Sequence, residues 1–181
     1  MTTARRLGGN LLVIGACAAL MALYLQRKQE QRLRMDLCLR AEASCLGPSL
    51  GQEQALIDLL AKPRRSKSDK AAALALLRGL RDCWRFASDL RADAPDDGFF
   101  LPLHQSEIWV MQSVQVGDDA IHLDPRGDAG ILRTALTGLR GNVVEQRRNL
   151  LAFAGACRAL PWTPAQAAAL DQWAQSLQPG R

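Results

Sequence analysis

The sequence has few aromatic residues, at 5% of the chain, and β-branched residues are scarce outside one short segment. Alanine, leucine, arginine and glutamine are abundant instead, and these residues favour helices. The shortage of strand-forming residues argues against a β-rich architecture. We therefore expect an all-α protein, and we find no internal repeat or low-complexity tract in it.

Recognisable catalytic motifs are also absent, including the G-x-S-x-G elbow, the phosphate-binding loop, H-E-x-x-H and G-x-G-x-x-G. The chain has only two histidines and no C-x-x-C pair, which argues against a zinc site. The best nucleophile hypothesis pairs Cys83 or Cys157 with His104 or His122. Both cysteines fall on apolar helix faces, however, where burial is the commoner role. We expect no enzymatic activity, no metal and no cofactor.

The most specific signal is an apolar run over residues 11–25, LLVIGACAALMALYL, which contains no charge and no proline. Basic residues flank it on both sides: Arg5, Arg6, Arg27 and Lys28. A membrane-spanning helix needs roughly 20 residues at ~1.5 Å each, and starting the run at Leu7 gives nineteen. The sequence therefore predicts a single transmembrane helix over residues 7–25, preceded by a basic tail over residues 1–6.

Three alternatives to an anchor fit this segment less well. A cleaved signal peptide should end its apolar stretch at a small-x-small site, whereas this run ends at Tyr24 and Leu25. A lipidated Cys17 would follow only six apolar residues and precede a longer apolar stretch. A buried core helix would not explain basic clusters at both ends and the N-terminal position.

Small residues lie on one side of the predicted span, at Gly15, Ala19 and Ala22. A stripe of this kind allows two helices to approach closely in a membrane. It predicts packing against a partner helix, the alternative being a span that is simply rich in alanine.

Residues 26–46 are rich in helix formers and are predicted to continue the membrane helix as a charged stalk, which ends at Gly47-Pro48. Within a regular helix, Cys38 and Cys45 would lie ~10.5 Å apart, beyond the ~7 Å limit for a disulfide. These two cysteines should therefore not pair unless the helix breaks.

Two observations disagree about the side of the membrane on which the rest of the chain lies. Basic residues are more numerous after the span than before it, which favours a cytoplasmic C-terminal domain. The cysteines beyond the span form an even set, suited either to disulfides in an oxidising compartment or to burial as small apolar residues. They are Cys38, Cys45, Cys83 and Cys157. We favour the extracytoplasmic side.

Residues 49–178 are long enough for one helical domain, which we expect to be a compact bundle. The predicted helices begin at Ser49, at about Asp69, after Asp128, just after Gly141, where Asn142 and Glu145 make a capping arrangement, and at Thr163, where Pro164 and Gln166 complete a capping box. Apolar residues of 99–103 should fold back onto the helices. Residues 107–123 contain β-branched and aromatic residues around Gly117 and predict a small β-hairpin, with a helix as the alternative.

A basic patch lies in the loop between the first two domain helices: Lys62, Arg64, Arg65, Lys67 and Lys70. Such a loop suits anionic lipid headgroups, an acidic protein partner or nucleic acid, and the alternative is a solvated loop without a ligand. No nucleic-acid-binding motif accompanies it, so nucleic acid is not an expected partner.

An anchor, a stalk and a helical domain without catalytic motifs predict a protein that presents a surface. We expect a single-pass, membrane-anchored interaction module, an accessory or assembly subunit of a larger membrane complex. The alternative is a membrane-tethered binding or inhibitory protein, of the immunity type, for one specific protein target. Expected partners are the lipid bilayer and either other subunits or that single target.

Overall fold

The computed structural model describes the backbone of residues 2–179 and the side chains of residues 14–179. The chain divides into two units, Met1–Asp36 and Leu37–Arg181, and each is described by itself. Every regular element among the described residues is a helix, so the all-α prediction is confirmed.

The first unit consists of helix α1, which runs over Thr2–Glu42 and continues into the second unit. Local contacts along it include a hydrogen bond from Gln26 Nε2 to Glu30 Oε1 and the Lys28 ammonium 5.6 Å from the Tyr24 ring centre. Among the described residues, none of the helices has the length and apolar character that a membrane crossing requires. The predicted span over residues 7–25 begins at residues whose side chains lie outside the described part.

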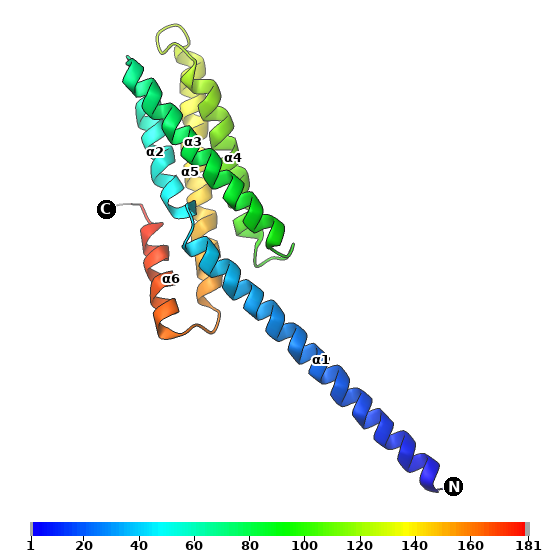
Figure 1. Cartoon of the computed structure of the whole chain (residues 1–181). Helices are drawn as coiled ribbons and strands as arrows, with labels where there is room; N and C mark the ends of the chain where they lie inside the picture. The colour runs from blue at the N-terminus through cyan, green and yellow to red at the C-terminus, as the bar shows by residue number, and fades with distance from the viewer. Residues whose placement is uncertain (1, 180–181) are drawn as a thin grey trace. The chain divides into compact units, whose positions relative to one another are not determined.

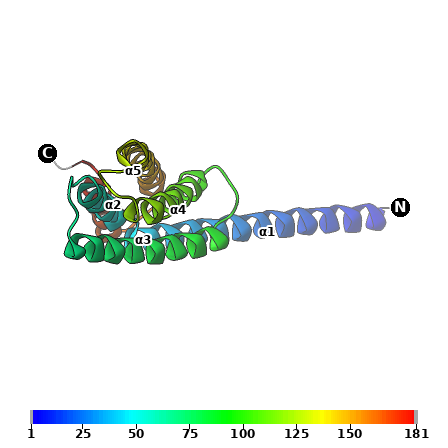
Figure 2. The ribbon, with the colours of Figure 1, turned by 90° about the horizontal axis from the view of Figure 1, so that it is seen from above.

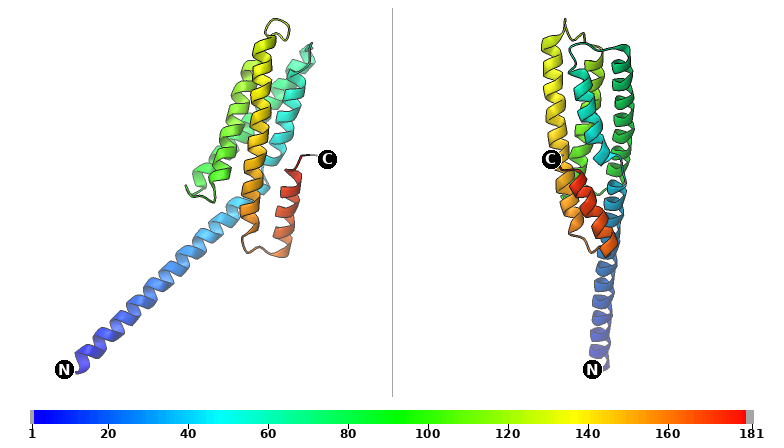
Figure 3. Two further views of the ribbon diagram at one scale, coloured as in Figure 1. Left: turned by 180° about the vertical axis from the view of Figure 1, so that it is seen from behind. Right: turned by 90° about the vertical axis from the view of Figure 1, so that its left-hand side faces the viewer.

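The second unit is a helical bundle. Its helices are α2 (Leu46–Leu60), α3 (Lys67–Asp93), α4 (Leu101–Ile121), α5 (Ala129–Arg158) and α6 (Pro164–Ser176). Helix α2 packs on α3, α3 on α4, α4 on α5, and α5 on α2, so these four enclose one core (Figures 1 and 2). Helix α6 turns back along the C-terminal part of α5 (Figure 3).

The last turns of α1 belong to this unit, since Leu37, Cys38 and Ala41 are completely buried. The prediction that the helix would end at Gly47-Pro48 is wrong. Helix α1 ends at Glu42, and Gly47 and Pro48 lie in the first turn of α2. Proline is tolerated there because it lacks a backbone N–H, and the N–H groups of the first helical turn have no acceptor within the helix in any case.

The predicted β-hairpin over residues 107–123 is wrong, because residues 107–121 of this segment lie in α4. Its buried residues include Val110, Val114, Gly117 and Ile121, whose spacings of four, three and four residues put them on one helical face. A Cβ atom at Gly117 would stand 2.8 Å from Leu77 Cδ2 and 2.9 Å from Leu56 Cδ2. The glycine therefore lets α4 pack closely on α2 and α3, and this packing overrides the strand propensity of the segment.

The two helices predicted after Asp128 and after Gly141 form one helix, α5. Gly141 lies in its middle, and nothing stands within 4 Å of the position of a Cβ there. Asn142, expected as a cap, instead donates from Nδ2 to the buried Ser113 hydroxyl at 3.3 Å. Its side chain serves tertiary packing, so the capping pattern with Glu145 does not mark a helix start.

Two helix starts use reciprocal capping boxes. Thr163 accepts from the Gln166 backbone N–H and the Gln166 side chain accepts in return, which confirms the predicted start of α6. Ser66 and Asp69 make the same arrangement at the start of α3, so α3 begins at Lys67, slightly earlier than predicted. These capping contacts are between residues close in sequence, and they set the N-terminal ends of α3 and α6.

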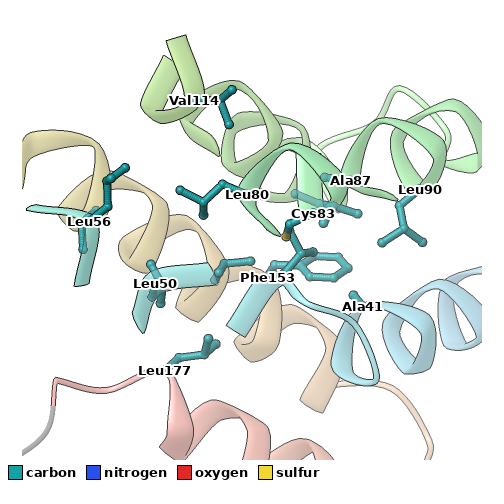
Figure 4. Packing of buried hydrophobic residues seen from close by; sticks show 14 of the residues in the cluster. Ala41, Leu50, Leu56, Leu80, Cys83, Ala87, Leu90, Val114, Phe153 and Leu177 are labelled. Atoms are coloured by element: carbon teal, nitrogen blue, oxygen red, sulfur yellow. The ribbon is translucent and has the colours of Figure 1, made fainter. Parts of the chain in front are cut away.

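The core joins residues from all the helices of the second unit (Figure 4). Phe100, placed by the loop before α4, is completely buried, as expected for residues that fold back onto the helices. Its ring contacts Phe153 at a centroid distance of 6.1 Å, and Phe153 contacts Trp173 of α6 at 6.4 Å. A disulfide between Cys38 and Cys157 joins α1 to the end of α5 beside this cluster.

Candidate functional site

A basic cavity of about 440 Å³ lies between the loop that joins α2 to α3 and the loop that joins α4 to α5. Both loops are at the same end of the bundle (Figure 1). Its charged and polar lining residues are Arg64, Arg65, Lys70, His122, Asp124 and Arg126, with Pro63, Leu123 and Pro125 between them. The lining thus contains three arginines and one lysine but only one carboxylate, that of Asp124.

Arg65 holds the two loops together. Its guanidinium donates to the carbonyl oxygen of Ala120 at 3.1 Å and to that of Leu123, at the C-terminal end of α4. The Ala120 oxygen also accepts the backbone N–H of Leu123 at 3.3 Å, and a cation at a helix C-terminus complements the helix dipole. The Arg65 guanidinium is therefore engaged by the backbone of the domain itself and fixes the shape of the cavity.

Lys62 is also engaged within the domain, since its ammonium lies 2.5 Å from the Asp69 carboxylate at the start of α3. Hydrogen bonds from Lys62 and Ser66 hold the pKa of Asp69 well below its usual range. Of the predicted basic patch, Arg64, Lys67 and Lys70 are exposed and make no ion pair within the described part of the chain. Arg64 and Lys70 line the cavity, whereas Lys67 does not.

Sequence reasoning missed Arg126, which lies more than fifty residues after the basic loop and faces the same cavity. The Arg126 backbone N–H donates to the Asp124 carboxylate at 3.0 Å, and the Asp124 N–H donates to Asp128 at 2.9 Å. These turn contacts fix the loop and leave the Arg126 side chain exposed. Nothing in the local sequence of this loop links it to the basic patch, because the link depends on the bundle topology.

A second polar cluster is buried inside the bundle. Ser113 donates to Glu53 at 3.1 Å, Asn142 donates to Ser113 at 3.3 Å, and Gln146 donates to Ser49 at 2.6 Å. Burial raises the pKa of Glu53 to about 8, against the opposing hydrogen bond from Ser113. One Glu53 oxygen has no partner within the described structure. The cluster therefore holds a carboxyl group that is mainly protonated at neutral pH.

The four cysteines of the second unit separate into two pairs. Cys38 and Cys157 form the disulfide, so Cys157 is not available as a nucleophile, and Cys38 does not pair with Cys45. Cys45 and Cys83 are free thiols, of which Cys45 is partly exposed and Cys83 is buried. Neither predicted histidine partner accompanies them: His104 is buried 3.9 Å from Asp96, and His122 lines the basic cavity.

The predicted packing stripe on α1, at Gly15, Ala19 and Ala22, is exposed. No atom of the described residues stands within 4 Å of the position that a Cβ would take at Gly15. No group of three or more potential metal-ligating side chains occurs among the residues that the structure describes.

Comparison with known proteins matched this chain to no protein-family model, no curated protein and no solved structure.

Proposed function

We propose that this protein is a membrane-tethered interaction module, an accessory or assembly subunit, that binds an acidic segment of a partner protein in its basic cavity. The observation that carries the proposal is the convergence of two loops on a cavity with an excess of cations. Arg64, Lys70 and Arg126 make no ion pair within the described part of the chain, whereas Arg65 fixes the shape of the cavity.

The proposed tether rests on the apolar surface of α1. Its large apolar side chains over residues 14–25 are 51–67% exposed: Ile14, Leu20, Met21, Leu23, Tyr24 and Leu25. An exposed apolar surface of this kind is a feature of membrane or protein contacts. With the uncharged run that starts at Leu11 and the flanking basic residues, it supports a single membrane anchor.

The arrangement of charge in the cavity favours a carboxylate-rich protein ligand. Arginine side chains can bind carboxylates with two parallel hydrogen bonds, which gives orientation as well as attraction. The lining also contains Pro63, Leu123 and Pro125, which offer apolar contact beside the charges. A short acidic peptide segment with apolar residues fits such a mixture.

Purification of the full chain from membranes in mild detergent tests the proposal. We expect a complex of constant stoichiometry that Arg64→Glu, Lys70→Glu and Arg126→Glu together disrupt. The matched control, Arg78→Glu with Arg85→Glu and Arg148→Glu, changes the same charge elsewhere on the bundle and should leave the complex intact. Equal loss in both triple variants would contradict a role for the cavity.

The anchor is tested separately by washing membranes with alkaline carbonate. A chain held by a spanning helix stays in the membrane pellet, whereas release into the wash would contradict the tether. Binding of one soluble protein by the chain, without other membrane subunits, would favour the inhibitory or immunity-type alternative over a subunit role.

A further inference from the structure

A second, smaller hollow adjoins the basic cavity, and we call it the α5 groove. Pro63 and Pro125 line both spaces, so the groove and the cavity lie on either side of these two prolines. The groove has a volume of about 210 Å³ and lies between the end of α2 and the first half of α5. Both helix segments are at the end of the bundle that carries the basic cavity (Figure 1).

The floor of the α5 groove is apolar. Leu132 and Leu136 line it from positions four residues apart, which puts them on one side of α5. Leu132 is 6% exposed and belongs to the core, and Leu136 is partly buried against the same core. Ala129, one turn before Leu132, is exposed and has only a methyl side chain. The groove therefore offers a firm apolar surface with room for a larger side chain.

The rim of the α5 groove is basic. Arg133 and Arg140 line it from positions seven residues apart, about two turns along the same side of α5. Both side chains are exposed, and neither makes an ion pair with any residue that the structure describes. No carboxylate stands among the described residues that line the groove. The positive charge of the cavity thus continues along α5, on both sides of an apolar floor.

We propose that the α5 groove is the second half of the docking surface and receives a large apolar side chain, such as leucine, of the acidic partner segment. This inference rests on the function proposed for the basic cavity and specifies its ligand. Carboxylates on one side of the apolar residue meet Arg64, Lys70 and Arg126, and carboxylates on the other side meet Arg133 and Arg140. The partner segment therefore has acidic residues on both sides of its apolar anchor.

The test uses the full chain in mild detergent and three fluorescein-labelled peptides of equal length, EDDLLDDE, EDDSSDDE and KRRLLRRK. Fluorescence polarisation measures the affinity of each peptide. We expect EDDLLDDE to bind about tenfold more tightly than EDDSSDDE, because its leucines are removed from water in the groove. KRRLLRRK keeps the leucines and reverses the charge, so it should not bind.

A substitution that fills the groove tests the same point from the side of the protein. Ala129→Trp leaves every charge in place and should weaken the binding of EDDLLDDE by about tenfold, with no change for EDDSSDDE. Ile131→Trp is the matched control, because Ile131 is 61% exposed on the same helix and lines neither space. Circular dichroism checks that both variants fold. Equal affinity of the parent chain for the two acidic peptides, or undiminished binding of EDDLLDDE by a folded Ala129→Trp variant, would overturn the inference.

The charge-reversed variant with Arg64→Glu, Lys70→Glu and Arg126→Glu separates this inference from the proposed function. If that variant loses both acidic peptides while Ala129→Trp changes nothing, the groove is excluded and the role of the cavity is supported. If it keeps both peptides, the function proposed for the cavity is contradicted. Failure of EDDLLDDE to bind the parent chain would also overturn the inference, whether anionic lipid or a second copy of the chain covers the surface instead.

Discussion

The Arg65 guanidinium donates a hydrogen bond to the Ala120 carbonyl oxygen at 3.1 Å and so joins the loop after α2 to the end of α4. This contact spans fifty-five residues of sequence, and it brings the two loops to one cavity. Arg65, which the sequence presents as one member of a basic patch, therefore holds the two loops of the candidate site together.

Replacing Arg65 with methionine should destabilise the bundle by about 1–3 kcal/mol, because the end of α4 loses its charged hydrogen-bond donor. Urea unfolding followed by circular dichroism measures this change. Arg64→Met is the matched control and should change the free energy of unfolding by less than about 0.5 kcal/mol, since Arg64 is exposed. Equal effects of the two substitutions would contradict the framework role of Arg65.

Glu53 should make stability depend on pH. Its pKa is raised from about 4.5 in the unfolded chain to about 8 in the bundle, so the folded state binds the proton more tightly. Stability should therefore fall as pH rises between these values, by at most roughly 1.4 kcal/mol per pH unit from this group.

Glu53→Gln removes the titration and keeps a similar shape. We expect the variant to match the parent near pH 4.5 and to be more stable at pH 8, as measured by urea unfolding at each pH. Parallel stability curves for the two proteins would show that Glu53 does not carry the pH dependence.

The close approach at Gly117 predicts a difference between two glycines of neighbouring helices. Gly117→Ala forces Leu56 and Leu77 to move and should cost about 1–3 kcal/mol. Gly141→Ala has open space around the new methyl group and should be neutral or stabilising by up to about 1 kcal/mol. Thermal unfolding of the two variants measures both effects, and a reversed order would mean that α4 packs differently.

The Cys38–Cys157 disulfide closes a loop with a sequence separation of 119 residues. In the loop-entropy account, a closure of this length stabilises the folded state by about 4–5 kcal/mol. The Cys38→Ala, Cys157→Ala double variant should therefore unfold at a much lower urea concentration than the Cys17→Ser control. A difference of less than 1 kcal/mol would indicate that the bond adds little to the packing between α1 and α5.

The sequence allowed the helical class and the capping box at Thr163 to be predicted because these depend on nearby residues. At the start of α6, the Thr163 and Gln166 side chains that make the box lie only three residues apart. The prediction failed at residues 107–123, where contact of Gly117 with Leu56 and Leu77 outweighs local strand propensity. Local patterns do not report contacts between distant helices.

The same reason explains what was missed at the candidate site. The basic loop was visible in the sequence, but Arg126 joins it only through the bundle topology, and Lys62 and Arg65 are engaged by the domain itself. The pairing of Cys38 with Cys157 likewise depends on how α1 enters the core. Spacing along the chain indicated only which cysteines would not pair.

The most direct test of the central claim is site-specific photo-crosslinking of the full chain in its native membrane. A photoreactive amino acid at Arg126 reports on the basic cavity, and the same group at Arg78 reports on the exposed side of α3. The account predicts one strong crosslinked protein from position 126, lost when Arg64 and Lys70 are changed to glutamate, and little from position 78. Equal crosslinking from both positions, or crosslinking at 126 that survives the charge reversal, would contradict it.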